Sequence, residues 1–315
     1  MLFNRLVRIL KEALFPSKCM GCGSFFHPPG DVAKRDDSSA AAYELDTMTF
    51  EKVMAPFLCS DCLCNFLPVE SPLCSVCGFV FKSREGNDHV CGNCLEHPKR
   101  FGKARSLGLY DKTLMEVIHS FKYKEKLQLA RPLEELLFSV FARNWNTDDF
   151  DLVVPVPLHV KRIRKRGFNQ AYYLVRGWPE IAGKFKAEPK RPERSPLPAA
   201  ESASEFKSDS NPSGLTSLRR IESCGVKLKS GNFDIGQDAL YRTTWTQPQT
   251  GLGRKKRMEN IRGAFSVGDE SKVKGKRVLL VDDVYTTGAT VNECAKAILG
   301  GGAVSVDVLT LARAV

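Results

Sequence analysis

Short apolar runs alternate with helix-like periodic segments along the last two thirds of the chain. Three runs rich in Val and Leu, at residues 151–157, 276–284 and 303–312, have the length of strands buried on both faces. A helix is expected ahead of them, with an apolar face formed by Leu114, Val117, Ile118 and Phe121. The pattern predicts an α/β domain over residues 101–315, with a mainly parallel sheet flanked by helices.

The start of the chain has a helical pattern of its own. Apolar residues recur at helical spacing between residues 2 and 14, and Arg5, Arg8 and Lys11 occupy the other faces. This pattern therefore predicts an amphipathic helix over residues 1–15. Such a helix either packs against the rest of the protein or lies on an anionic membrane or a partner.

Two stretches lack this periodicity. Residues 24–56 contain HPPGD and AKRDDSSAAA, which predict a loop insertion. Residues 185–240 include five prolines and eight serines between Phe185 and Ser223, with almost no periodic apolar residues. We predict that this second stretch is a disordered insertion within the α/β domain.

Nine of the eleven cysteines precede residue 95, and eight of these nine are spaced as Cys-x-x-Cys pairs. Two such pairs complete a closed tetrahedral zinc site, which stabilises a fold and leaves no open position for a substrate. Residues 16–100 are therefore predicted to form a zinc-binding module with one or two structural ions. The predicted ligands are Cys19, Cys22, Cys59, Cys62, Cys74, Cys77, Cys91 and Cys94.

Several alternatives accompany this zinc prediction. The sequential partition assigns the first four cysteines to one ion and the last four to another, but spacing alone leaves an interleaved partition open. Redox dithiols, an iron–sulfur centre and disulfides are competing interpretations, and disulfides are disfavoured in a cytosolic chain. Other candidate ligands are Cys64, His27, His89 and His97, whereas Cys224 and Cys294 are isolated and suit buried or incidental thiols.

The charge balance narrows the range of partners. Forty-seven Lys and Arg against 36 Asp and Glu give a formal net charge of +11. This excess favours phosphates, nucleic acid or lipid headgroups. No apolar run approaches the roughly 18 residues of a membrane-spanning helix, and the first residues lack a signal-peptide core. We therefore expect a cytoplasmic protein without a transmembrane segment.

The segment VLLVDDVYTTGAT, at residues 278–290, places two acids at the carboxyl end of a strand and a small polar loop before a helix. Ligands of open α/β sheets bind at that edge. Asp282 and Asp283, the candidate catalytic residues, can accept hydrogen bonds from ribose hydroxyls or hold a hydrated Mg²⁺. The candidate phosphate-binding residues are Thr286, Thr287, Gly288, Ala289 and Thr290. Together these residues predict a ribose 5-phosphate ligand.

This segment closely resembles the phosphoribosyl-pyrophosphate (PRPP) binding motif of the type I phosphoribosyltransferases. Two further motifs follow the Cys-rich region, RGFNQ at residues 166–170 and QTGL at residues 249–252. With these motifs, essentially the whole chain except for the two insertions resembles the ComF family of competence-associated phosphoribosyltransferase-like proteins. The sequence departs from the family in its insertions and at Gly253, where the family often has a hydroxyl residue. The resemblance implies a type I phosphoribosyltransferase-like fold, an N-terminal double zinc ribbon, and a role in uptake or use of external DNA.

Two basic clusters accompany these motifs. The first, at residues 161–166, follows the strand that ends near Pro157, and its arginines suit the oxygens of pyrophosphate. The second lies in a stretch that the resemblance assigns to a mobile loop over the ligand. A solvated basic face is the competing interpretation. The candidate pyrophosphate and loop residues are Arg162, Arg164, Arg166, Arg254 and Lys255.

Two functions fit these residues. One is a PRPP-dependent transferase in nucleotide metabolism, which uses Mg²⁺ to displace pyrophosphate with an unknown base. The other is a PRPP-binding protein of DNA uptake that holds single-stranded DNA. Phe168, Tyr172 and Tyr173 are candidates for base stacking, although aromatic residues beside a helix more often belong to the core. We favour the DNA-uptake-associated protein, and the sequence leaves its catalytic activity undecided.

Overall fold

The computed structural model describes residues 16–29, 48–83, 85–123, 126–185, 233–245 and 261–314. The predicted helix at residues 1–15, most of both predicted insertions and the QTGL motif lie outside these ranges. Within them, no helix is both long enough and apolar enough to cross a membrane.

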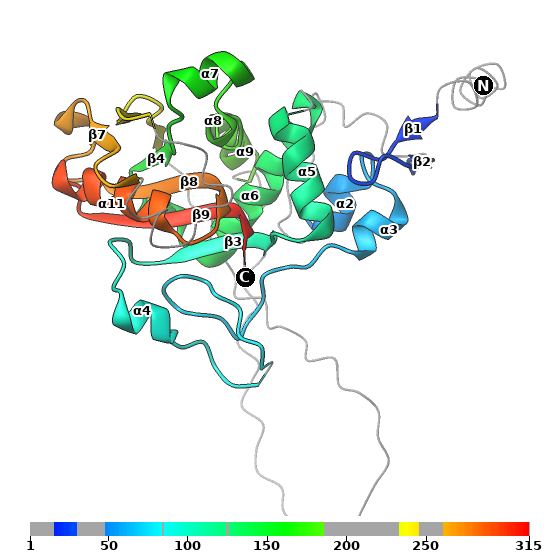
Figure 1. Cartoon of the computed structure of the whole chain (residues 1–315), viewed down its shortest axis with the longest axis horizontal. Helices are drawn as coiled ribbons and strands as arrows, with labels where there is room; N and C mark the ends of the chain where they lie inside the picture. Colours follow the sequence, from blue (N-terminus) through cyan, green and yellow to red (C-terminus); the bar gives the residue numbers. More distant parts are fainter. Residues whose placement is uncertain are drawn as a thin grey trace, which may run out of the picture.

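A five-stranded sheet forms the centre of the molecule, and all its neighbouring strands are parallel (Figure 1). Across the sheet the strands are β3 (Ala104–Leu109), β9 (Ser305–Arg313), β8 (Arg277–Tyr285), β4 (Leu152–Pro155) and β5 (Asp234–Ile235). The expected α/β class is confirmed, and each of the three predicted strand segments overlaps one of these strands. Because parallel strands share a direction, their carboxyl ends meet at one edge.

The two faces of the sheet contact different helices. Side chains of successive strand residues point to opposite faces, so Leu279 and Val281 of β8 join one core and Val278 and Leu280 join the other. The first core contains side chains of α5 (Lys112–Tyr123), α6 (Ala130–Asn144) and α9 (Trp178–Phe185). The second contains side chains of α11 (Ala289–Gly300). The predicted apolar stripe on residues 114–121 lies on α5 and is buried in the first core.

The remaining elements of the α/β domain are short. They are the helices α7 (Val160–Arg166) and α8 (Gln170–Tyr173), the antiparallel pair β6 (Leu240–Arg242) and β7 (Phe265–Val267), and the 3-10 turns η2 (Leu127–Leu129), η3 (Thr147–Asp149) and η4 (Glu270–Lys272). The pair β6 and β7 brackets the range 246–260, which lies outside the described residues.

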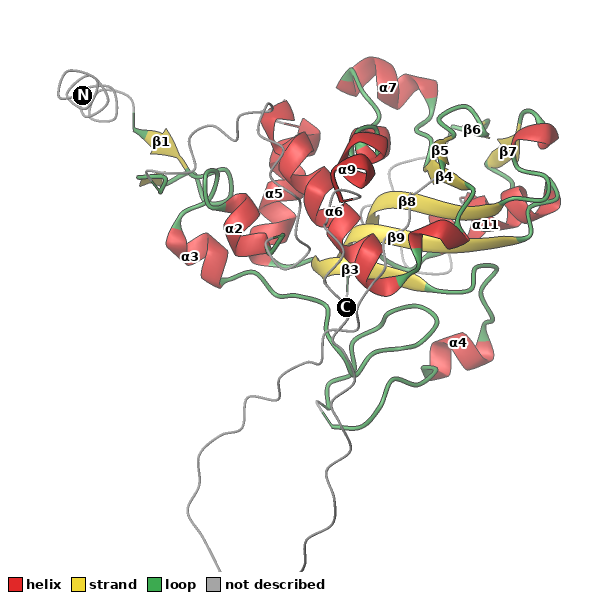
Figure 2. Cartoon of the chain, turned by 180° about the vertical axis from the view of Figure 1, so that it is seen from behind, coloured by secondary structure: helices red, strands yellow, loops and turns green. Residues whose placement is uncertain are grey.

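The Cys-rich region packs against two separate parts of this domain. Its first part has the antiparallel pair β1 (Ser17–Lys18) and β2 (Phe25–Phe26) and the helices α2 (Phe50–Met54) and α3 (Ser60–Cys64). These elements lie beside α5, whereas α4 (Gly92–Glu96) and its loops lie beyond β3, at the edge of the sheet (Figures 1 and 2).

Both predicted insertions include ordered segments. Helix α2 falls within residues 24–56, and its Phe50 is buried and stacks on Phe66 with ring centroids 3.7 Å apart. Strand β5 falls within residues 185–240, next to Phe233, whose ring lies 5.9 Å from that of Phe141. Elements of five and two residues are too short to display a period. Their apolar side chains nevertheless complete the core.

Candidate ligand site and metal centres

The loop between β8 and α11 has the geometry expected of a phosphate cradle. Gly288 ends the loop in the left-handed region, with φ of 75°, and a Cβ there would collide with the Tyr285 hydroxyl. Only glycine therefore fits without distortion. Thr287 Oγ1 accepts a hydrogen bond from the Ala289 N–H at 3.4 Å. The first N–H groups of α11 have no partners within the helix, so this end of α11 suits an anion.

The two acids of the site are buried at the end of β8. Asp282 Oδ1 accepts a hydrogen bond from the Asp283 N–H at 2.8 Å. Burial, followed by the charge of Asp283, raises the pKa of Asp282 to about 7. Near neutral pH Asp282 is therefore readily protonated, so its carboxyl group can donate as well as accept hydrogen bonds to hydroxyl groups.

Lys122 is a further member of this site that the sequence pattern did not indicate. It lies on the last turn of α5, and its Nζ is 2.7 Å from Asp283 Oδ2. Both side chains are largely buried, with 14% and 8% of their surface exposed. A lysine at a helix end is common, and only the packing of α5 against the sheet brings it to Asp283.

Helix α7 divides the first basic cluster between two faces. Arg162 and Arg166 are half-buried and one turn apart, so they share a face, whereas Arg164 is exposed, as are the two lysines of the helix. Arg166 donates a hydrogen bond to the buried Gln170, and its guanidinium lies 5.0 Å from the centroid of the Tyr123 ring. The structure thus separates the five cations that the sequence treats as one group.

Arg162 belongs to the same neighbourhood as the acid pair. Burial, followed by the positive charge of Arg162, lowers the pKa of Arg242, and the charge of Asp282 acts in the opposite direction. Arg162 also lies 5.8 Å from the centroid of the Trp245 ring. Arg254 and Lys255 lie outside the described residues, between β6 and β7.

The RGFNQ motif holds α7 in place. Gly167 ends the helix with φ of 85°, and Asn169 donates from Nδ2 to the Val156 carbonyl at 3.2 Å. Phe168 is buried, with its ring 5.5 Å from that of Phe121, so of the two roles open to it, core packing is correct and base stacking is wrong. The exposed aromatic rings near α7 include those of Tyr123 and Trp245, which are 67% and 40% exposed.

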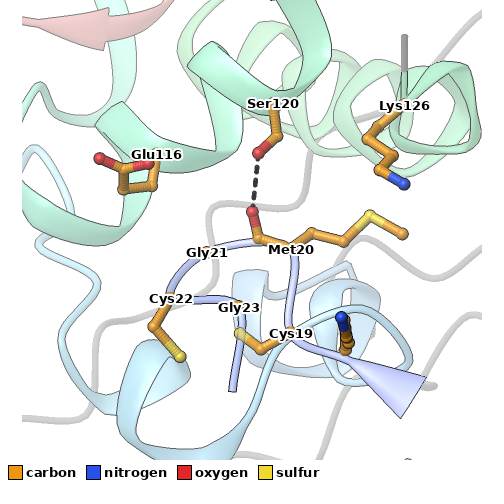
Figure 3. A pocket seen from close by; sticks show the side chains of 9 residues that line it. Cys19, Met20, Gly21, Cys22, Gly23, Glu116, Ser120 and Lys126 are labelled. Carbon is orange, nitrogen blue, oxygen red and sulfur yellow. Dashed lines mark hydrogen bonds between the residues drawn. The ribbon is translucent and has the colours of Figure 1, made fainter. Parts of the chain in front are cut away.

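The first cysteine group consists of Cys19, Cys22, Cys59 and Cys62, whose Sγ atoms all lie within 4.8 Å of one another. Cys22 and Cys59 are 3.7 Å apart at sulfur, close to the roughly 3.8 Å that tetrahedral coordination with 2.3 Å Zn–S bonds requires. The group lies beside a half-open cavity next to α5, where Ser120 Oγ donates to the Met20 carbonyl at 2.9 Å (Figure 3). The donor set and the separations fit zinc.

The second group consists of Cys74, Cys77, Cys91 and Cys94, which are all buried and also lie within 4.8 Å of one another at sulfur. The N–H groups of Cys77 and Cys91 donate to Cys74 Sγ at 3.4 and 3.3 Å. Burial opposes ionisation of Cys74, but these backbone hydrogen bonds lower its pKa to about 6. They favour the thiolate, which is the form that binds a metal.

The structure thus brings the cysteines together in the sequential partition. Cys64, His27, His89 and His97 belong to neither group among the described residues. His89 instead stacks on Phe81, with ring centroids 4.0 Å apart. Cys294 lies on α11 and is buried in the second core, and Cys224 lies outside the described residues.

Comparison with known proteins finds similarity over most of the chain. A model of the phosphoribosyl transferase domain matches residues 239–314, which include β8, the phosphate loop, α11 and β9. Competence protein F of Haemophilus influenzae is 27% identical over 275 residues, which cover 82% of this chain and 97% of that protein. This similarity to competence protein F extends over most of the chain, which is ComF-like in that sense.

Two further relatives of the ComF-like chain extend the comparison. The DNA utilization protein YhgH of Escherichia coli K12 is 27% identical, over 81% of this chain and 90% of that protein. Competence protein ComFC of Bacillus subtilis is 23% identical, over 81% of this chain and 84% of that protein. The similarity to these relatives extends well beyond residues 239–314, which match the model of the transferase domain.

Proposed function

We propose that this ComF-like chain binds PRPP and acts in the uptake or use of external DNA. The observation that supports the ligand is the pairing of Asp282 and Asp283 with the Gly288 loop, at one edge of a parallel sheet. The acids suit the ribose hydroxyls, and the loop and the start of α11 suit the 5-phosphate. The names of the relatives support the link with DNA.

The pyrophosphate of PRPP would lie against Arg162 and Arg166, the two half-buried cations of α7. Guanidinium groups bind phosphate oxygens through two parallel hydrogen bonds, so these arginines suit it better than lysine. Lys122 compensates the charge of Asp283. Mg²⁺ would supply further neutralisation of the pyrophosphate, with the carboxylates of Asp282 and Asp283 as oxygen ligands.

Calorimetric titration of PRPP with Mg²⁺ tests this proposal. The wild-type chain is expected to bind, and the double variant Asp282→Asn/Asp283→Asn is expected to lose at least about tenfold in affinity, because charged hydrogen-bond acceptors are removed. Asp149→Asn is the matched control, since Asp149 is an exposed acid before β4, at the opposite edge of the sheet. No binding by folded wild-type protein would refute the proposal.

An assay of pyrophosphate release with candidate bases then separates the two functions. Release would make the chain a phosphoribosyltransferase of nucleotide metabolism. Binding without release would favour a PRPP-binding protein that serves DNA uptake.

We also propose single-stranded DNA as a partner of the exposed face of α7. Trp245 is exposed beside this helix, and Lys161 Nζ lies 5.5 Å from the centroid of its ring. Cations that neutralise phosphates and an aromatic ring that stacks on bases are the two elements of sequence-tolerant binding to single strands. Fluorescence anisotropy with labelled oligonucleotides should show weaker binding by Trp245→Ala, by about 1–3 kcal/mol for one stacked base. Unchanged affinity would exclude Trp245 from the DNA surface.

The two cysteine groups are proposed to hold one structural zinc ion each. Zinc would supply cross-links between chain segments that are far apart in the sequence, and it takes no part in the chemistry at the ligand site.

A further inference from the structure

Arg313 is a buried cation that connects the second cysteine group to the phosphate loop. It lies near the end of β9, and only 6% of its surface is exposed. Its Nη1 donates to the Cys77 carbonyl at 2.6 Å, and its Nη2 lies 3.5 Å from Cys77 Sγ. On its other side, the guanidinium lies 4.0 Å from the centroid of the Tyr285 ring.

The positive charge of Arg313 lies beside the second cysteine group. None of the ion pairs formed between described residues involves this side chain. An arginine in a protein stays charged, and a buried charge without a counter-charge is strongly destabilising. Four thiolates around one zinc ion carry a net negative charge, so the second cysteine group, holding zinc, would provide the counter-charge for Arg313.

Tyr285 lies between Arg313 and the phosphate loop. Its ring is buried between Arg313 and Phe101, whose ring centroid lies 6.2 Å away in an edge-on arrangement. Its hydroxyl lies against Gly288, at the point where a Cβ would collide with it. Tyr285 and Arg313 are also register partners in β8 and β9. The Tyr285 ring therefore limits the space that is available to the phosphate loop at Gly288.

We infer that Arg313 positions the phosphate loop through Tyr285 and makes the loop geometry depend on zinc in the second cysteine group. This inference rests on the proposed phosphate binding by residues 286–290 and on the proposed zinc site. Loss of the ion would leave Arg313 without its counter-charge, release the Tyr285 ring, and loosen the Gly288 turn. The zinc module would then control ligand binding from outside the ligand site.

The test measures zinc retention and loop order in the full-length chain loaded with zinc. Arg313→Met removes the charge and keeps much of the side-chain volume. The Arg313→Met variant is expected to release one zinc ion to a chromogenic chelator at least about tenfold faster than wild type. Loss of a residue that contacts a metal ligand commonly weakens metal binding by about this factor. Hydrogen exchange in peptides that contain residues 285–291 is expected to accelerate by about tenfold, and PRPP affinity to fall by a similar factor.

Two control variants separate this coupling from general damage. Arg105→Met also removes a cation beside the second group. Among the described residues, the Arg105 side chain donates to the Ser75 carbonyl at 3.2 Å and to the Ala104 carbonyl, and not to the phosphate loop. Cys22→Ser removes a ligand of the first group. Both should leave exchange in residues 285–291 within twofold of wild type, whereas Cys77→Ser should accelerate it as Arg313→Met does.

The outcomes distinguish the inference from the proposed function. If Cys77→Ser loses one zinc ion while exchange in the loop stays at the wild-type rate, the coupling is refuted. A lower melting temperature of Arg313→Met with unchanged zinc release and loop exchange would refute it too, because Arg313 would then act only in packing. If the exchange responds as expected but wild type binds no PRPP, the coupling stands and the proposed ligand falls.

Discussion

Asp282 is held in a position that opposes its ionisation. Burial and the neighbouring Asp283 raise its pKa to about 7, although Lys122 is paired with Asp283 nearby. Such an arrangement costs stability and persists where a ligand uses it. The acid pair at the end of β8 is in this sense a preformed acceptor for hydroxyl groups.

The sign of this effect on stability can be tested with Asp282→Asn. The pKa of Asp282 is about 7 in the folded chain, above its ordinary value of 3.8. Its contribution to stability is therefore fully present below about pH 3.8 and is lost as the pH rises through about 7. Asparagine carries no charge, so the melting temperature of Asp282→Asn relative to wild type should be more favourable at pH 8 than at pH 4.

Calorimetric unfolding at both pH values measures this difference. Each kcal/mol corresponds to roughly 2–4 °C for a domain of this size. Asp149→Asn removes a carboxylate at the other edge of the sheet, and this variant should not show the same gain in melting temperature at pH 8. Equal shifts of Asp282→Asn at pH 4 and pH 8 would contradict the raised pKa.

At the scale of elements, α7 has two faces that differ in exposure. His159 caps the start of the helix by accepting the Lys161 N–H at 3.2 Å, and Gly167 ends it. Between these ends, one face carries the half-buried Arg162 and Arg166, and the other carries Arg164 into solvent. Under the proposed function, this seven-residue helix would bind pyrophosphate on the first face and single-stranded DNA on the second.

Two pairs of substitutions on α7 should separate these partners. Arg162→Met/Arg166→Met is expected to reduce pyrophosphate affinity by at least about tenfold, because charged hydrogen bonds contribute roughly 1.5–3 kcal/mol each. Arg164→Glu/Lys165→Glu is expected to weaken binding of single-stranded DNA for every sequence and to reduce its salt slope by roughly 1.4 for the two lost phosphate contacts.

Each pair is the matched control for the other. Calorimetry with pyrophosphate and anisotropy with oligonucleotides should give opposite patterns for the two variants. If both variants lose pyrophosphate binding equally, α7 acts as one diffuse basic surface.

At the scale of the whole molecule, the two cysteine groups stabilise different regions. Cys19 and Cys62 belong to the core that contains α5 and α6. All four cysteines of the second group belong to the core that contains α11. The Cys-rich region is therefore part of both cores and does not form a separate domain beside the sheet.

Zinc analysis of the purified chain should give two equivalents. Cys19→Ser and Cys74→Ser should each lose one, since each removes a thiolate from a different group. Chelation of both ions is expected to lower the melting temperature, because metal binding contributes to folding free energy. One equivalent in wild type, lost on Cys74→Ser alone, would contradict the presence of two independent sites.

The sequence predicted those features that depend on local spacing. The Cys-x-x-Cys pairs, the strand that carries Asp282 and Asp283, and the glycine before α11 are each defined within a few residues, and the structure places them as spacing suggests. Hydrophobic runs also indicated the α/β class, because strands buried on both faces need continuous apolar residues.

Tertiary packing decided the features that join distant segments. Nothing in the sequence around Lys122 or Arg313 indicates that one meets Asp283 and the other meets Cys77, since these contacts form only when α5 and the second cysteine group pack against the sheet. Phe168 shows the same limit, because an aromatic residue beside a basic cluster suits either solvent or core. The amino-acid sequence by itself thus determined the local motifs, including the cysteines of both groups. Only the three-dimensional structure decided which cations lie beside these motifs, because charge pairing depends on distance in space and not along the chain.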